Sequence, residues 1–536
     1  MFVRRNRNRS GTVSVQVLEK KGRSNRLVRT FGTSSDEEEL RRYELEARMW
    51  IDEQAGPAIF DLDGMEAIRT ASDYDAVFSG ISQRDLVLSG PELVYGRLFD
   101  RIGYGRVRTS DSLLFRSLVL TRLYKPGSKL RTRDYLYYFM GVDYGEDRIY
   151  RYLDRLCVRK EAGNSPEEQE ASERAGVKYQ VEQVTYEWTE SVMEGRISVV
   201  FYDTTTMYFE SREDEMRVPG WSKDGKSSNP QVVLGLLVSC GGNPIGYEIH
   251  RGNRYEGDTL LPIIRKLQKR YGFGKPVVVA DAGLLSRANM KALEDDGYEY
   301  ILGARLRSMD GETRKEVLSL SLCNGQSGSV SVGDGRRMVV TMSDARARKN
   351  AADRSRGLER LEKRIGSGRL TKASLNNRGY NRFLTMEGNA RIIIDRSRIE
   401  EDARFDGLKG YITNSSLPDS EIVDNYRYLF MIERAFRFNK TDLDIRPVYH
   451  RLFNRIEAHV CICFTAYTIM LELERILKAS GSGITLSKAM FLTEKIYRLN
   501  YVNPFNRKKM SVIIKTDEDK EINELLSIID AACKND

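Results

Sequence analysis

Apolar and polar residues alternate through the first 33 residues, around Gly11 and Gly22, and this pattern predicts a small β unit over residues 1–35. The apolar spacing becomes helical from Glu37 to Glu53 and again from Pro91 to Cys157, so we expect a helical domain over residues 36–160. The polar stretch that follows contains Gly and Pro and predicts a linker over residues 161–180.

After the linker, the pattern predicts five strands and two amphipathic helices. In chain order they are a strand at 197–203, strands at 231–239 and 243–250, a helix at 258–271, a strand at 275–281, a helix at 286–296 and a strand at 298–304. Three strands in a meander followed by two crossover units is the order that a ribonuclease H-like fold requires. The predicted class is therefore α/β, with a mixed sheet.

Two of these five strands are expected to end on an aspartate, Asp203 and Asp281, each after a continuous apolar run. If the first and fourth strands are neighbours, both carboxylates project from adjacent strand ends. An aspartate at a strand end can instead form a turn or cap a helix, and that reading remains open for each of the two.

A third carboxylate lies in residues 424–450, which begin as a helix. Tyr426, Glu433 and Lys440 are spaced by seven, so a continuous helix would place them along one face. Apolar residues surround Glu433 in the sequence, and a buried carboxylate requires a compensating cation or metal. The alternative is an ordinary salt bridge within the helix, from Glu433 to Arg437.

The chain carries a formal net charge of +9, with a pI of about 9.0, which favours a polyanionic partner such as nucleic acid. Residues 336–382 hold fourteen Lys/Arg against four Asp/Glu. This segment is either a solvated basic helix with a loop or an insertion that follows DNA phosphates. Five of its residues are the candidate phosphate contacts: Arg354, Arg356, Arg360, Lys363 and Arg364.

Three carboxylates suit Mg²⁺, which prefers hard oxygen ligands, and two such ions per site support phosphodiester chemistry. We expect Asp203, Asp281 and Glu433 to hold them, with Mn²⁺ as a substitute ion. The three histidines, His250, His450 and His459, are expected to be structural. The six cysteines form no zinc-type pair, which favours a reducing, cytoplasmic setting. No apolar stretch approaches the roughly 20 residues of a membrane helix, so no membrane partner is expected.

These residues resemble DDE transposases of bacterial insertion sequences, in the group with a Tyr-Arg-Glu-Lys signature. Tyr426, Glu433 and Lys440 fit the signature, whereas Leu429 stands where the family has arginine. Arg427 and Arg437 are the candidates to replace that arginine. The segments YDTTT, VVADAGLLS, RGNRYEGDT, DGLKGYITN and IRPVYHRLFNRIEAHVCICFTA are also similar to the family, and the resemblance runs from about residue 195 to 475.

The resemblance implies a ribonuclease H-like catalytic core over residues 181–305 and 395–480, with a basic, largely β insertion at 306–394 before the glutamate helix. It implies that Asp203, Asp281 and Glu433 form the catalytic triad and that Tyr426 and Lys440 contact DNA near the scissile phosphate. Residues 36–160 would bind DNA, and residues 481–536 are a candidate dimer contact.

The implied activity is cut-and-paste transposition of double-stranded DNA, acting on transposon ends and target DNA, by a homodimer or higher assembly. Two alternatives remain open. One is a nuclease of the same fold that does not join ends, and the other is a repressor or architectural protein that binds DNA without cutting it.

Overall fold

The chain divides into two compact units in the computed structural model. The first comprises Met1–Val181 and Ala458–Asp536, and the second comprises Glu182–Glu457. The structure describes residues 1–22, 24–55, 59–60, 81–82, 85–157, 172, 174–195, 197–209, 214, 216–220, 228–284, 286–367, 370, 375–376, 379–387, 391–441, 452–502, 508–515 and 519–534.

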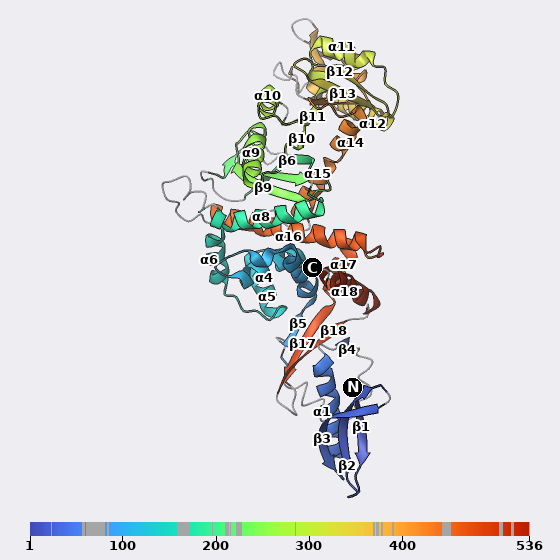
Figure 1. Ribbon diagram of the computed structural model, residues 1–536. Coiled ribbons are helices and arrows are strands. Elements are labelled where there is room, and N and C mark those ends of the chain that lie inside the picture. The colour runs from blue at the N-terminus through green and yellow to red at the C-terminus, as the bar shows by residue number, and fades with distance from the viewer. Residues whose placement is uncertain are drawn as a thin grey trace. The chain divides into compact units, whose positions relative to one another are not determined.

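The second unit contains a large mixed sheet (Figure 1). Its strands within the described ranges are β6 (Val199–Tyr208), β7 (Val218–Pro219), β8 (Pro230–Ser239), β9 (Pro244–Arg251), β10 (Val277–Ala280), β11 (Tyr300–Ala304), β12 (Ser327–Ser331), β13 (Arg337–Met342) and β16 (Leu408–Thr413). They are ordered β12-β13-β16-β11-β10-β6-β8-β7, and β9 also pairs with β8.

The middle of this sheet has the predicted elements in the predicted order. β6 is antiparallel to β8 and parallel to β10, and β10 is parallel to β11. The two crossover helices are α9 (Leu260–Tyr271) and α10 (Arg287–Asp295). The neighbour order β9-β8-β6-β10-β11 fits a ribonuclease H-like core.

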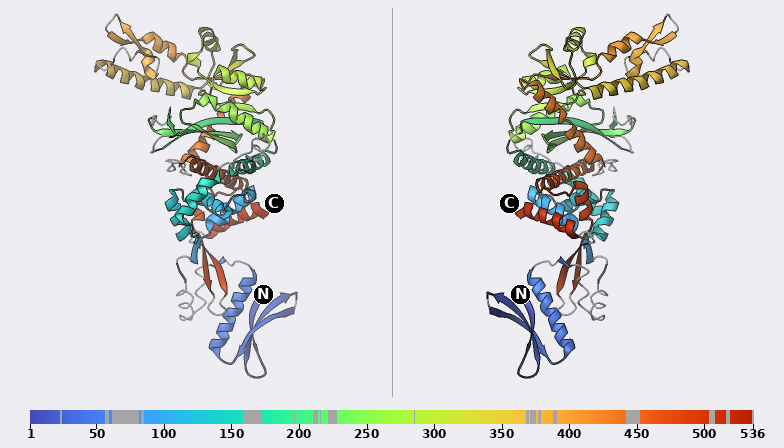
Figure 2. Two further views of the ribbon diagram at one scale, coloured as in Figure 1. Left: turned by 90° about the vertical axis from the view of Figure 1, so that its left-hand side faces the viewer. Right: turned by 90° about the vertical axis from the view of Figure 1, so that its right-hand side faces the viewer.

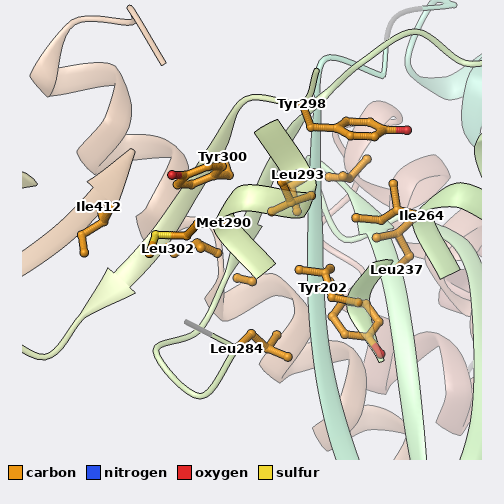
Figure 3. Packing of buried hydrophobic residues seen from close by; sticks show 14 of the residues in the cluster. Tyr202, Leu237, Ile264, Leu284, Met290, Leu293, Tyr298, Tyr300, Leu302 and Ile412 are labelled. Carbon is orange, nitrogen blue, oxygen red and sulfur yellow. The ribbon is translucent and has the colours of Figure 1, made fainter. Parts of the chain in front are cut away.

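One face of the sheet packs against α9 and α10. Ile264 of α9 and Leu293 of α10 are fully buried in one cluster with Tyr202 of β6 and Tyr300 of β11 (Figure 3). The cluster continues through Leu302 to Ile412 of β16. In β6, β10 and β11 alternate residues belong to this core, and the residues between them face the other side.

The prediction that Asp203 ends its strand is wrong. β6 continues to Tyr208, and residues 204–206 are buried threonines that pair with β8. β8 is ten residues long, so its ladder holds β6 well beyond the aspartate, and β-branched threonine suits a buried strand. The ladder to β10 ends one residue before Asp203, at Tyr202.

A second prediction is also wrong: Tyr426 and Glu433 do not share one continuous helix. The segment forms α14 (Asp419–Arg427) and α15 (Phe430–Thr441), and the chain tightens between them. There the Met431 and Ile432 amides donate to carbonyls three residues back, at 2.9 and 3.2 Å. The seven-residue spacing therefore does not place Tyr426 and Glu433 along one helix face.

The segment between β11 and β16 adds to the same sheet, because β13 pairs with β16 and β12 pairs with β13. The rest of this segment comprises α11 (Gly311–Ser319), α12 (Asp344–Gly366), the hairpin of β14 (Leu384–Glu387) and β15 (Arg391–Ile394), and α13 (Arg396–Ala403). Figure 2 shows α12 as a long helix in this segment.

The first unit begins with an antiparallel sheet of β1 (Phe2–Arg7), β2 (Val13–Lys21) and β3 (Ser24–Ser34), followed by α1 (Glu37–Ala55). A second sheet joins β4 (Ile59–Phe60) and β5 (Leu86–Leu88) to the C-terminal strands β17 (Ile496–Val502) and β18 (Lys509–Lys515). The remaining helices are α3 (Arg97–Ile102), α4 (Ser112–Tyr124), α5 (Lys129–Tyr138), α6 (Glu146–Leu156), α17 (Leu486–Thr493) and α18 (Asp519–Lys534). Two longer helices, α8 (Val177–Val192) and α16 (Phe453–Ala479), each begin in one unit and end in the other.

Across the described ranges, no helix combines the length and apolar character needed to cross a membrane.

The helices of the first unit bury an unusual cation. Lys129, at the start of α5, is only 4% exposed. Burial, with a smaller contribution from the positive charge of Arg122, lowers the pKa of Lys129 to about 7, and Cys463 acts in the opposite direction. In the unfolded state, the pKa of a lysine is about 10.4.

This difference predicts a pH-dependent stability. Between pH 7 and 10 the unfolded state binds one more proton at Lys129 than the folded state, so the folded state gains stability as the pH rises. The gain is up to about 1.4 kcal/mol per pH unit. The thermal unfolding midpoint of the wild type should rise relative to that of Lys129→Met between pH 7 and 9.5. Parallel curves for the two proteins would contradict the assignment.

Candidate active site

Both aspartates lie on the sheet face opposite α9 and α10. Tyr202 and Ala280 point into the core, so Asp203 and Asp281, the next residue of each chain segment, project from the other face. β6 and β10 are parallel, with Tyr202 opposite Ala280. The two carboxylates therefore occupy neighbouring positions on one face. Each side chain accepts a hydrogen bond from the following amide, Thr204 at 2.7 Å and Ala282 at 2.6 Å.

Tyr426 lies on this same face, because its helix, α14, packs against β11. Its hydroxyl donates to Asp281 Oδ1 at 3.4 Å, and its ring lies 4.6 Å from the ring of Tyr411 on β16. Gly303 of β11 makes the approach possible, because a Cβ there would lie 2.5 Å from the tyrosine hydroxyl. A side chain at this position would displace Tyr426 from Asp281.

Lys409 of β16 is a cation beside the acidic groups, since Asp281 and Glu433 act on it. Its Nζ lies 4.3 Å from the centroid of the Tyr426 ring and 5.5 Å from that of Tyr411. Lys409 and Tyr411 alternate with the core residues Leu408 and Ile412, so they occupy the same face as the aspartates. The ammonium and the ring attract each other through a cation–π interaction.

Glu433 comes from α15, which lies against β6. The helix buries Ile432, Ala435 and Phe436, whereas Glu433 is exposed. The prediction that apolar neighbours bury this carboxylate is therefore wrong, because those neighbours occupy the other side of the helix. An exposed carboxylate keeps its hydration and is available to a ligand.

The electrostatics connect all three carboxylates to the pair formed by Tyr426 and Lys409. Burial raises the pKa of Tyr426, and the charges of Asp281 and Asp203 raise it further. Burial lowers the pKa of Lys409 and nearby Arg346 adds to this effect, while Asp281 and Glu433 oppose it. Asp281 thus acts on both Tyr426 and Lys409, whereas Asp203 acts on the tyrosine and Glu433 on the lysine.

The chemistry of this donor set fits a hard divalent cation, since all three groups offer carboxylate oxygens. In the described part of the chain, no three His, Cys, Asp or Glu side chains converge closely enough to form a metal cluster. The fit therefore rests on the chemistry of the donors and on their shared neighbours.

The remaining signature residues divide between described and undescribed parts. Leu429 lies at the break before α15 and is buried. Arg437 and Lys440 belong to α15, but their side chains lie outside the described atoms. His450 also lies outside the described residues, while His250 and His459 are buried.

The basic candidates of α12 have two different environments. Arg354 is largely buried and makes a bidentate pair with Asp406, at 2.7 and 2.6 Å. The other four are exposed, and among them Arg356 pairs with Asp353. They are Arg356, Arg360, Lys363 and Arg364.

The sequence interpretation missed Lys409, Tyr411 and Gly303. Alternation along β16 does place Lys409 and Tyr411 on one face. Which face that is depends on the pairing of β16 with β11, about 105 residues earlier in the chain, and no local pattern specifies that pairing.

Comparison with known proteins identifies the domain that contains this site. Residues 194–469 match the model of the transposase DDE domain, and this range is just over half of the chain. The chain belongs to the transposase DDE domain family. Asp203, Asp281, Tyr426 and Glu433 all lie within the matched residues of this transposase domain.

Two solved transposase structures are similar to this chain. One is a piggyBac transposase synaptic complex with hairpin DNA, with 12% sequence identity, a TM-score of 0.39, and coverage of 76% of each chain. The other is a Mos1 transposase paired-end complex with the left transposon end, with 13% identity and a TM-score of 0.15, covering 35% of this chain and 57% of that one. A search of curated proteins finds no match.

The contact between Gly303 and Tyr426 can be tested with one methyl group. Gly303→Ala places a carbon 2.5 Å from the tyrosine hydroxyl, so the hydroxyl must leave Asp281. We expect DNA cleavage by the transposase domain to fall at least about tenfold, the effect of misplacing an active-site group. Cleavage rate and thermal midpoint are the measurements.

Gly311→Ala in α11 is the matched control, because a Cβ there meets nothing within 4 Å. It should leave both measurements unchanged. Wild-type cleavage by Gly303→Ala would show that the tyrosine contact has no role.

Proposed function

We propose that this protein is the transposase of an insertion sequence, which binds the element's terminal inverted repeats and moves the element by cut-and-paste. The observation that carries the proposal is the placement of Asp203 and Asp281 side by side on one sheet face, beside the helix of Glu433. Family membership supports the same chemistry. In this proposal the ribonuclease H-like core comprises residues 181–305 and 395–480.

The three carboxylates would hold two Mg²⁺ ions, or Mn²⁺ in their place. When bound, such ions activate the attacking oxygen and stabilise the leaving oxygen of a phosphodiester. Asp203 and Asp281 project from neighbouring strands of a buried sheet, which keeps their separation fixed. Glu433 comes from a helix, so its position follows from how α15 packs on β6.

Tyr426 would position a carboxylate of the site, and Lys409 would reduce the repulsion between the carboxylates and a DNA phosphate. The tyrosine hydroxyl donates to Asp281 and so holds one carboxylate in place. The ammonium of Lys409 lies near Asp281 and Glu433, and it offsets part of the repulsion between these acids and an incoming phosphate.

The proposed reaction has two phosphoryl transfers. Water first attacks a phosphodiester at the transposon end and releases a 3′ hydroxyl. That hydroxyl then attacks a second phosphodiester, either on the opposite strand or in target DNA. Residues 36–160 and the exposed side of α12 are the proposed DNA contacts, together with Tyr426, Arg437 and Lys440, and residues 481–536 are the proposed contact in a homodimer or higher assembly.

Removing any one carboxylate should abolish cleavage without abolishing binding. Asp203→Ala, Asp281→Ala and Glu433→Ala are each expected to lower Mg²⁺-dependent cleavage of a labelled inverted-repeat duplex at least about a hundredfold, because each loses a ligand for the ions. Cleavage and strand joining are measured on gels, and binding by fluorescence anisotropy.

Glu316→Ala is the matched control, since this glutamate is exposed on α11, on the segment between β11 and β16. A carboxylate variant that cuts at the wild-type rate is not part of the triad. If the wild type cuts but never joins ends, the protein is a nuclease, and if it binds without cutting, it is a repressor or architectural protein.

Neutralising the exposed side of α12 should weaken DNA binding at every sequence. We expect the variant with glutamine at Arg356, Arg360, Lys363 and Arg364 to flatten the salt dependence of binding, by about one unit of slope for each lost phosphate contact. Arg354→Gln is the contrasting variant, because it loses the pair with Asp406 and should mainly lower the thermal midpoint. An unchanged salt slope in the fourfold variant would show that this side of α12 does not contact DNA.

A further inference from the structure

The three-stranded sheet at the start of the chain has one face covered by α1. Val15 and Val17 of β2 are fully buried against Leu40 and Ala47 of this helix. Arg5 of β1 turns to the same side and bonds Glu44 and Glu37, each at 2.6 Å. Figure 2 shows α1 along this face of the sheet.

The opposite face presents an ordered set of side chains, which we name the open face: Phe2, Arg4, Asn6, Ser14, Gln16, Leu18, Leu27, Thr30 and Thr33. Paired residues share a face and successive residues alternate, so these side chains point away from α1. One row runs across all three strands, because Arg4 pairs with Gln16 and Gln16 pairs with Thr30.

The open face is accessible to a ligand. Arg4 and Thr30 are exposed, and Phe2 and Leu27 expose 39% and 50% of their surface. Leu18 and Ser14 of the same face are buried. Asn8 reinforces this part of the sheet by donating to the Ser14 hydroxyl at 2.7 Å.

Charge is divided between the two sides of this small fold. By the same pairing, Arg4 and Lys20 lie on the open face with no acidic residue among the paired positions, whereas Arg7, Lys21 and Arg26 turn to the side of α1, which holds seven Asp/Glu and three Arg. Arg5 and Arg29 serve the helix side, since Arg29 lies over the rings of Phe31 and Trp50 at 5.0 and 5.7 Å. A polyanion is therefore attracted to the sheet and repelled by the helix.

The side-chain chemistry of the open face matches the edges of base pairs. In the major groove of B-DNA, arginine pairs with guanine, asparagine and glutamine pair with adenine, and apolar groups contact the thymine methyl. All of these types occur here, and strands of a β sheet fit into that groove. Membrane headgroups and acidic proteins would need only the positive charge.

We propose that the open face of β1–β3 binds the major groove of double-stranded DNA. Arg4, Asn6 and Gln16 contact base edges, and the exposed Arg9 and Lys20 contact phosphates beside them. This inference rests on the proposed function in one respect, since the DNA that it reads would be the transposon end.

The experiment uses the full-length chain and a library of duplexes with 20 random base pairs, followed by affinity measurements on the enriched duplex. The variant Arg4→Ala/Asn6→Ala/Gln16→Ala should bind that duplex at least about tenfold more weakly, the cost of losing specific base contacts. Lys291→Ala on the exposed side of α10 removes the same charge away from every proposed DNA contact and should bind like the wild type.

Two further variants separate base reading from charge. Arg4→Lys keeps the charge but loses the bidentate geometry, so it should lose selectivity at one base pair and keep the wild-type salt slope. Arg9→Ala/Lys20→Ala should weaken all duplexes equally and reduce the slope by about two units. Arg9 is exposed in the turn after β1 and Lys20 is exposed near the end of β2, so folding should be unaffected, as circular dichroism can check.

Three outcomes would overturn the inference. The triple variant could bind the enriched duplex as the wild type does, the wild type could enrich no sequence, or an RNA duplex of the same sequence could compete equally. An A-form major groove is too deep and narrow for these side chains, so equal competition excludes groove reading.

Binding and cleavage are scored separately. Selective binding by a wild type that never cuts DNA leaves this inference standing while the proposed function fails. If the wild type cuts DNA and the triple variant keeps full selectivity, the proposed function stands and this inference fails.

Discussion

The parallel pairing of β6 with β10 is the constraint on which the candidate site depends. It sets Tyr202 beside Ala280 in the core, and the next residue along each segment is an aspartate on the opposite face. Shifting this register by one residue would turn one carboxylate into the apolar core. The packing of α9 and α10 on the other face opposes any such shift, because it would expose Ile264 and Leu293 to polar groups.

The glycine at position 303 allows Tyr426 to reach Asp281. Without a Cβ at Gly303, the Tyr426 ring can lie over β11, where its hydroxyl meets Asp281 and its face meets Lys409. The tyrosine thus supports a carboxylate and a cation at once. Burial and the nearby acids both raise the pKa of Tyr426, so its hydroxyl keeps the proton that it donates. An acidic site with its own internal cation is less repulsive to a phosphate than carboxylates alone would be.

Positive charge is unevenly used along this chain. In α12, Arg354 neutralises Asp406 and holds the helix to the chain just before β16, while other basic side chains of the same helix remain exposed. In the first sheet, Arg5 binds two glutamates of α1, while Arg4, one residue earlier, lies on the other face. A count of lysine and arginine therefore indicates a polyanion partner but does not identify the residues that contact it.

The sequence by itself determined the central elements of the second unit. Its apolar runs marked β6, β8, β9, β10, β11 and the two crossover helices, because strand and helix periods are local properties. It also singled out Asp203, Asp281 and Glu433. Only the tertiary structure decided where β6 ends, because β6 stays paired with β8 through the three threonines after Asp203. Only packing divided the segment around Glu433 into two helices, α14 and α15. Lys409 and Gly303 join the site through strand pairings between distant segments, and such pairings depend on the whole sheet rather than on neighbouring residues.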